Sequence, residues 1–238
     1  MSLDASLLSH CHAIVHRIAP ELRGVHIVPD SVFEGLAMPP DCRGFAIESE
    51  HLTFDISERL PEHTSTSPVI VLCPNAIRED SSDDAFRDGV MSVLLHEAAH
   101  LLPRPVAAGR ISPPDFSYLD CAAVRARLDE RRAKAIALPE PSPDAEDAVH
   151  GWRFLRRVCH LWSRARLAGW DVPTAGLLGN SFWYCSQEAH WVMSLFSELV
   201  RLRNATFCEI ESTEPPKEFM SMWQHALSTF YRFRGTQT

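Results

Sequence analysis

Apolar positions along the chain follow a helical period first and the period of a strand soon after. In residues 5–18, apolar side chains recur at intervals of three and four until Pro20, which predicts an amphipathic helix. The period then shortens, and β-branched or alternating segments bounded by Pro, Gly, Asp and Asn are typical of a small sheet. These segments are residues 24–30, 44–57 and 67–75. The most continuous apolar run, at 69–72, predicts a well-covered strand.

The pattern returns to a helical period at about residue 82, and helical segments separated by loops at 103–117 and 170–181 follow to about residue 233. Ser81 or Ser82 can cap a helix whose first turn carries two aspartates, where the helix dipole favours negative charge, and prolines from Pro103 onward end it. Further helices are expected at about 119–137, 143–168, 182–203 and 216–233. Because no internal repeat or linker is evident, we expect one α+β domain over residues 1–238. Its sheet-containing part would span about 20–102 and its helical part about 119–235.

The last turns of the helix that begins near residue 82 carry a metal-binding motif. The segment DGVMSVLLHEAAHLL, residues 88–102, places His96, Glu97 and His100 in the spacing HExxH. Histidines four residues apart lie one helical turn apart on the same face, so both imidazoles can bind one metal ion. The glutamate between them can act on a water molecule at that ion. The motif therefore predicts a Zn²⁺ site held by His96 and His100, with Glu97 as general base.

A catalytic zinc site usually takes three protein ligands, so this pair of histidines needs a partner. The glycine and third histidine of the metzincin extension are absent from the sequence LLPRPVAAG that follows His100. The preferred third ligand is His150, in the segment DAVHGWRFLRRVCHL. Three further candidates remain open, and these are His160 and the helical glutamates Glu188 and Glu198. Cys73 precedes the motif helix, as in deformylase-like sites, but the rest of that motif is missing.

The HExxH motif, followed by His150, Gly151 and Phe154, resembles the SprT/Spartan-like zincin metalloproteases. Those proteins carry a third histidine within an HGxxF element that opens the next core helix. The resemblance implies a zincin-like α+β fold in which a small N-terminal sheet packs on the HExxH helix and the C-terminal half is mostly helical. Gly151 would allow close helix approach, and Phe154 would pack beneath the metal. The resemblance covers residues 67–102 and the start of helix 143–168, and no zinc ribbon follows.

The activity expected from these residues is that of a zinc-dependent hydrolase, a metallopeptidase or amidase acting on a protein or peptide substrate. A metal-activated water would attack the peptide bond, with Glu97 accepting its proton. Asp147 or Glu146 could orient the imidazole of His150 from the outer shell. The donor that would stabilise the oxyanion stays open among Tyr118, Tyr184 and His190.

The alternative function is a non-catalytic zincin-fold module with a structural or protein-interaction role. In such a protein the two histidines would only tie helices together. Several of the six tryptophans would then mark a partner-binding surface, although packing in the core is their ordinary role. The tryptophans considered for this surface are Trp183, Trp191 and Trp223.

Composition and charge narrow the choice of partners. The formal net charge of −8 gives no overall attraction for nucleic acid or an anionic membrane, so a nucleic-acid partner is not expected. No apolar run is long enough to span a membrane. The seven cysteines are scattered singly, without a CxxC pair, which is typical of reduced thiols in a cytoplasmic protein.

Overall fold

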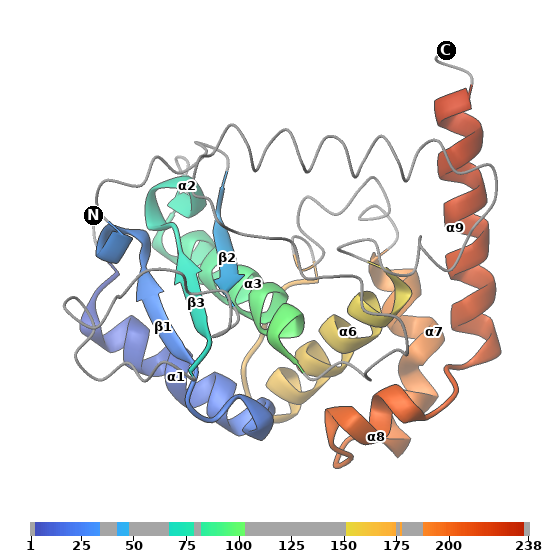
Figure 1. The fold of residues 1–238 in the computed structure, drawn as a ribbon, viewed down its shortest axis with the longest axis horizontal. Coiled ribbons are helices and arrows are strands. Elements are labelled where there is room, and N and C mark those ends of the chain that lie inside the picture. The colour runs from blue at the N-terminus through green and yellow to red at the C-terminus, as the bar shows by residue number, and fades with distance from the viewer. Residues whose placement is uncertain are drawn as a thin grey trace.

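The computed structural model of the protein describes residues 3–33, 42–47, 67–78, 82–102, 151–174, 177 and 188–235. A small mixed sheet and the helix that follows it come from the N-terminal part of the chain, and the C-terminal part described is helical (Figure 1). This arrangement confirms the α+β class that the sequence predicts. The expected helix at 119–137 lies outside the described residues.

Three short strands form the described sheet in the order β1-β3-β2. Strand β1 (His26–Pro29) runs parallel to β3 (Val69–Leu72), and β2 (Gly44–Ile47) runs antiparallel to β3, with Gly44 opposite Leu72. All four side chains of β3 are fully buried, because a continuous Val-Ile-Val-Leu run has apolar groups for both faces of the sheet. The expected well-covered strand at 69–72 is confirmed. Strand β2 is left at an edge of the described sheet.

The N-terminal helices begin and end where the sequence places their signals. Helix α1 (Ala5–Ile18) has the predicted bounds and is capped by Asp4. Helix α3 (Asp83–Leu101) is capped by Ser82, whose Oγ accepts a hydrogen bond of 3.3 Å from the Ala85 amide. It ends because Leu102 takes the extended conformation that a following proline favours. The short helix α2 (Pro74–Arg78) joins β3 to this segment and was not predicted.

The predicted helix at 143–168 is wrong at its start and right at its end. Gly151 is extended and caps the N-terminus of α6 (Trp152–Leu167), so a helix cannot run through it from residue 143. Glycine is a poor residue for a helix interior but serves well at an N-cap. At the other end Gly169 has a φ of 95°, the left-handed conformation that terminates many helices, and its amide donates to the carbonyl of Arg166.

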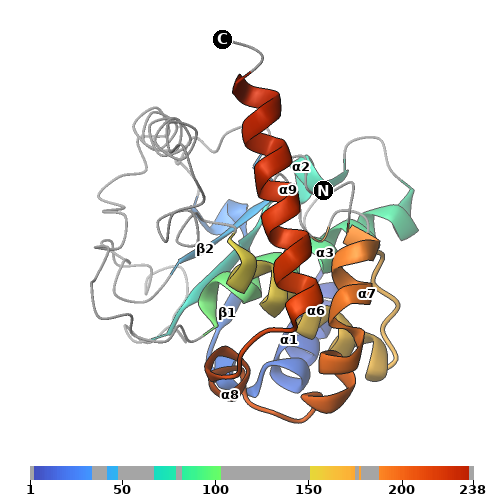
Figure 2. The same ribbon diagram turned by 90° about the vertical axis from the view of Figure 1, so that its right-hand side faces the viewer.

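Three more helices complete the described chain: α7 (Glu188–Arg201), α8 (Phe207–Ser212) and α9 (Lys217–Gly235). Helices α7 and α9 lie side by side and match the helices expected at 182–203 and 216–233 (Figure 2). Helix α8 was not predicted, although a capping box formed by Thr206 and Glu209 marks its start in the sequence.

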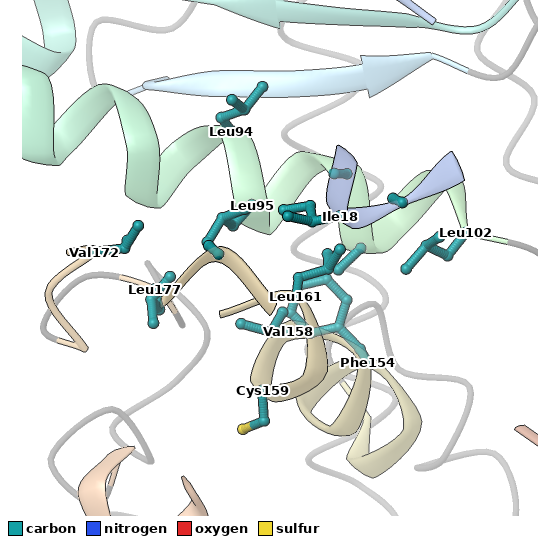
Figure 3. Packing of buried hydrophobic residues seen from close by; sticks show 14 of the residues in the cluster. Ile18, Leu94, Leu95, Leu102, Phe154, Val158, Cys159, Leu161, Val172 and Leu177 are labelled. Atoms are coloured by element: carbon teal, nitrogen blue, oxygen red, sulfur yellow. The ribbon is translucent and has the colours of Figure 1, made fainter. Parts of the chain in front are cut away.

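A continuous apolar cluster joins the helices to one face of the sheet. Figure 3 shows Phe154, Val158 and Leu161 of α6 on the side of that helix that faces α3. Trp191 and Trp223 belong to the same cluster, with ring centroids 6.0 Å apart, so neither lies on a surface that could bind a partner. Trp183 lies outside the described residues. A smaller cluster covers the opposite face of the sheet around Val69 and Val71.

A buried polar network ties α6 to α7 in the middle of this apolar core. The Arg156 guanidinium donates two hydrogen bonds of 2.9 Å to the two carboxylate oxygens of Glu198 and a third, of 2.8 Å, to the carbonyl of Thr213. Nε2 of His160 lies 2.6 Å from the same carboxylate. All three side chains are at most 2% exposed. The network therefore joins two helices with charges that have no access to water.

Loss of the carboxylate from this network should be costly. We expect Glu198→Gln to lower the free energy of unfolding by about 3–5 kcal/mol, because Arg156 keeps its charge without its buried partner. Urea denaturation measures this change. The matched control is Asp171→Asn, since Asp171 is 91% exposed beside Arg166 and its loss should cost about 0–1 kcal/mol. Equal effects of the two substitutions would contradict the assignment of Glu198 as a buried ion partner.

The same network predicts a loss of stability in acid. Burial lowers the pKa of His160 below 6.5 and outweighs the hydrogen bond to Glu198, so folding excludes a proton that the unfolded chain binds. This contribution is fully present above the unfolded pKa and is lost as the pH falls through 6.5 toward the folded pKa. The free energy of unfolding, followed by urea titration from about pH 8 to about pH 5, should therefore fall less in His160→Gln than in the unsubstituted protein. An unchanged slope would show that His160 does not titrate differently on folding.

Candidate metal centre

The two motif histidines lie on the same side of the last turns of α3. Their ring centroids are 5.1 Å apart, and the rings are inclined at 68° to one another. Both side chains are partly exposed, in contrast to the neighbouring Ala98 and Ala99, which are fully buried. The helix thus buries one side in the core and presents His96 and His100 together at its margin. This is the placement that the HExxH spacing predicts.

Phe154 of α6 packs against both imidazoles. Its ring stacks on that of His100, with centroids 4.4 Å apart and an angle of 30° between the planes. It meets the ring of His96 edge to face at 4.9 Å. Such contacts restrict the rotation of both imidazoles, so α6 orders the pair from outside the motif helix. Phe154 lies more than 50 residues after the two histidines in the sequence, and the packing of α6 on α3 brings the three rings together.

The orientation of His96 is also set by a backbone carbonyl. Its Nδ1 lies 3.1 Å from the oxygen of Leu177, 81 residues further along the chain. A proton on Nδ1 that is donated to this carbonyl leaves Nε2 with a lone pair, the form in which histidine binds metals. Burial lowers the pKa of His96 to about 4 despite the hydrogen bond, so the ring is neutral near pH 7. Leu177 could not be predicted from the sequence, because any residue can supply a carbonyl.

Glu97 points to the sheet side of α3, beside β2. Its side chain is 8% exposed, and its Cγ lies 3.5 Å from where a Cβ on Gly44 would stand. Burial raises the pKa of Glu97 to about 8, and the nearby Cys42 adds to the rise. A carboxyl group with a pKa near neutrality can both accept and release a proton at physiological pH.

The preferred third ligand falls outside the part of the chain that the structure describes. This also holds for Asp147, Glu146, Tyr118 and Tyr184. The residue bonded to His150 is Gly151, which is buried at the N-terminus of α6, one turn before Phe154. Among the described residues, no group of three or more His, Cys, Asp or Glu side chains is arranged to hold a metal ion.

The alternatives to His150 as third ligand are His160, Glu198 and Glu188, and the structure shows other contacts for the first two. Both oxygens of Glu198 accept hydrogen bonds from Arg156 and His160, so a metal ion at this carboxylate would have to displace a buried guanidinium. His160 is committed to the same network. The side chain of Glu188 lies outside the described residues, and His190 is exposed on α7. The structure therefore places His160 and Glu198 in the buried polar network between α6 and α7.

Comparison with protein-family models, with characterised proteins and with solved structures finds no significant match. Among the described helices, none combines the length and the apolar character needed to cross a membrane.

The close approach of β2 to α3 can be tested at Gly44. A Cβ on this residue would stand 2.5 Å from Cγ1 of Val93 and 2.9 Å from the carbonyl oxygen of Val71. Gly44→Ala should therefore lower the free energy of unfolding by about 1–3 kcal/mol, as measured by urea denaturation. Adding Val93→Ala removes the nearest atom and should recover part of the loss after allowance for the effect of Val93→Ala alone. A Gly44→Ala protein as stable as the parent would show that β2 and α3 are further apart than these distances indicate.

Proposed function

We propose that the protein is a zinc-dependent hydrolase with a zincin-like centre, acting as a metallopeptidase. The observation that carries the proposal is the arrangement at the end of α3. Two ordered imidazoles lie on one side of the helix, and between them in the sequence stands a glutamate buried against the edge strand β2. This combination matches what the resemblance to SprT/Spartan-like proteins implies.

The donor set fits zinc. His96 is neutral and its Nδ1 is engaged with the Leu177 carbonyl, so Nε2 is the atom that would bind zinc beside His100. His150 is proposed as the third ligand because it precedes Gly151 and Phe154, as the histidine does in the HGxxF element of the SprT/Spartan-like proteins. Asp147 or Glu146 are proposed to orient its ring. Three histidines would leave one coordination position open, as in catalytic zinc sites.

The chemistry divides between the ion and the chain. Bound zinc would supply the Lewis acidity that polarises a carbonyl and makes water acidic enough to lose a proton near pH 7. Glu97 would accept that proton during the attack on the peptide carbonyl and return it to the leaving nitrogen. Its burial beside Gly44 keeps competing water away from the carboxylate.

The position of β2 favours an extended peptide as substrate. Its N-terminal residue, Gly44, lies next to the side chain of Glu97, and β2 is an edge of the described sheet. A peptide can bind to such an edge by adding a strand, with its backbone amides paired and its scissile carbonyl held at a fixed place. We therefore propose protein or peptide substrates in preference to small amides.

Zinc content tests the ligand set. The purified protein should hold one zinc ion, and His96→Ala and His100→Ala should each weaken zinc binding by more than the 10- to 100-fold that loss of an outer-shell partner costs. His150→Ala should do the same if residue 150 completes the set. Metal analysis and competition with a chelating dye measure these affinities. His190→Ala, which removes an exposed histidine on α7, is the control and should leave zinc bound.

Catalysis is tested separately from metal binding by Glu97→Gln. This protein should keep its zinc, because Glu97 is not proposed as a ligand, and should hydrolyse a mixture of fluorogenic peptides about 100- to 10,000-fold more slowly than the parent. Full activity in the zinc-loaded variant would exclude Glu97 as the general base. A zinc-loaded parent protein without any hydrolysis would favour the non-catalytic zincin-fold module instead.

A further inference from the structure

Two cysteines lie at the end of the sheet that is next to Glu97. Cys73 directly follows β3, and Cys42 lies two residues before β2. The Cys73 amide donates a hydrogen bond of 2.9 Å to the Arg43 carbonyl, which continues the pairing of Gly44 with Leu72 by one residue. Neighbouring strands are about 5 Å apart, so a step of one residue puts the two Cα atoms about 6 Å apart, within the range that a disulfide requires. Inside regular strands such a pair would point to opposite faces, but both cysteines lie just beyond the ends of their strands.

The two side chains are also in contact. The Cys42 thiol donates to the carbonyl of Gly44 at 3.5 Å, so its sulfur is available to accept a hydrogen bond. The thiol of Cys73 makes a hydrogen bond with this Cys42 side chain. Cys73 is buried, whereas Cys42 is partly exposed. Both are thiols in the structure.

We propose that Cys42 and Cys73 form a disulfide when the protein meets a peroxide, so that this pair is an oxidation site beside the motif helix. The sulfur of Cys42, which solvent reaches, attacks one peroxide oxygen. The O–O bond breaks, one water molecule leaves, and Cys42 becomes a sulfenic acid. The sulfur of Cys73 then attacks that of Cys42, the S–O bond breaks, and a second water molecule leaves with the Cys73 proton. In total, two thiols and one hydrogen peroxide give one disulfide and two waters.

The bond would act on the surroundings of Glu97. Gly44, two residues after Cys42, packs against the side chain of Glu97. A disulfide would tie the segment before β2 to the end of β3 and fix the position of Gly44. This consequence for catalysis rests on the proposed function, but formation of the disulfide does not.

Peptide mapping tests the oxidation site without reference to activity. The full-length protein is reduced, desalted, treated with hydrogen peroxide, denatured and alkylated, and its proteolytic peptides are then identified by mass spectrometry. We expect one cross-linked species that joins the peptides of Cys42 and Cys73 with the loss of two hydrogens, and that dithiothreitol reverses. In Cys42→Ser this species should be absent and Cys73 should be alkylated.

Cys208 provides the internal control because it is exposed on α8. The peroxide concentration is raised until Cys208 is oxidised, which shows that the oxidant has acted. If Cys42 and Cys73 are then still alkylated, or if either is cross-linked to a different cysteine, the proposal is wrong. A cross-link between these two residues in a protein that hydrolyses no peptide would leave the oxidation site standing and would count only against the proposed function.

Discussion

Helix α6 is the element on which the described parts of the chain converge. One side of it packs on α3 through Phe154, Val158 and Leu161, and Phe154 contacts both motif histidines. The guanidinium of Arg157 also donates to the carbonyl of Leu102, just beyond the end of α3. Two other side chains of α6, Arg156 and His160, bond to the carboxylate of Glu198 on α7. The same helix thus orders the imidazoles and anchors the C-terminal helices.

The candidate centre shows the mixture of burial and exposure that chemistry on a substrate requires. Glu97 is buried between α3 and the sheet, whereas His96 and His100 stay partly exposed at the margin of the core. Burying a carboxyl group costs free energy unless it is paired, and this cost appears as the raised pKa of Glu97. Burial of Glu97 therefore lowers the stability of the fold. The buried charges of Arg156 and Glu198, in contrast, are satisfied by hydrogen bonds to one another. This contrast supports a chemical role for Glu97 and a structural role for Glu198.

The sequence predicted what local patterns control. Helix α1, strand β3, the Ser82 cap and the end of α3 before Pro103 all follow from periodicity, caps and prolines within a few residues. The start of α6 was missed because an apolar pattern can continue through a glycine that caps the helix.

Contacts between distant segments could not be predicted from such patterns. The carbonyl of Leu177 meets His96 from 81 residues away, and a backbone carbonyl carries no sequence signature. The helical pattern around Glu198 does not show whether its side chain faces solvent or the core. Its pairing with Arg156 accounts for its burial. The adjacency of Cys42 and Cys73 depends on the pairing of β2 with β3, which is set by the whole sheet.

We propose that His96 and His100 hold one zinc ion together with a third imidazole. X-ray absorption spectroscopy of the zinc-loaded protein tests it most directly, because scattering from imidazole rings and from sulfur is distinct. We expect three imidazole nitrogens at about 2.0 Å and one further oxygen. A sulfur ligand at about 2.3 Å would contradict it, and so would a shell of four protein ligands with no place for water.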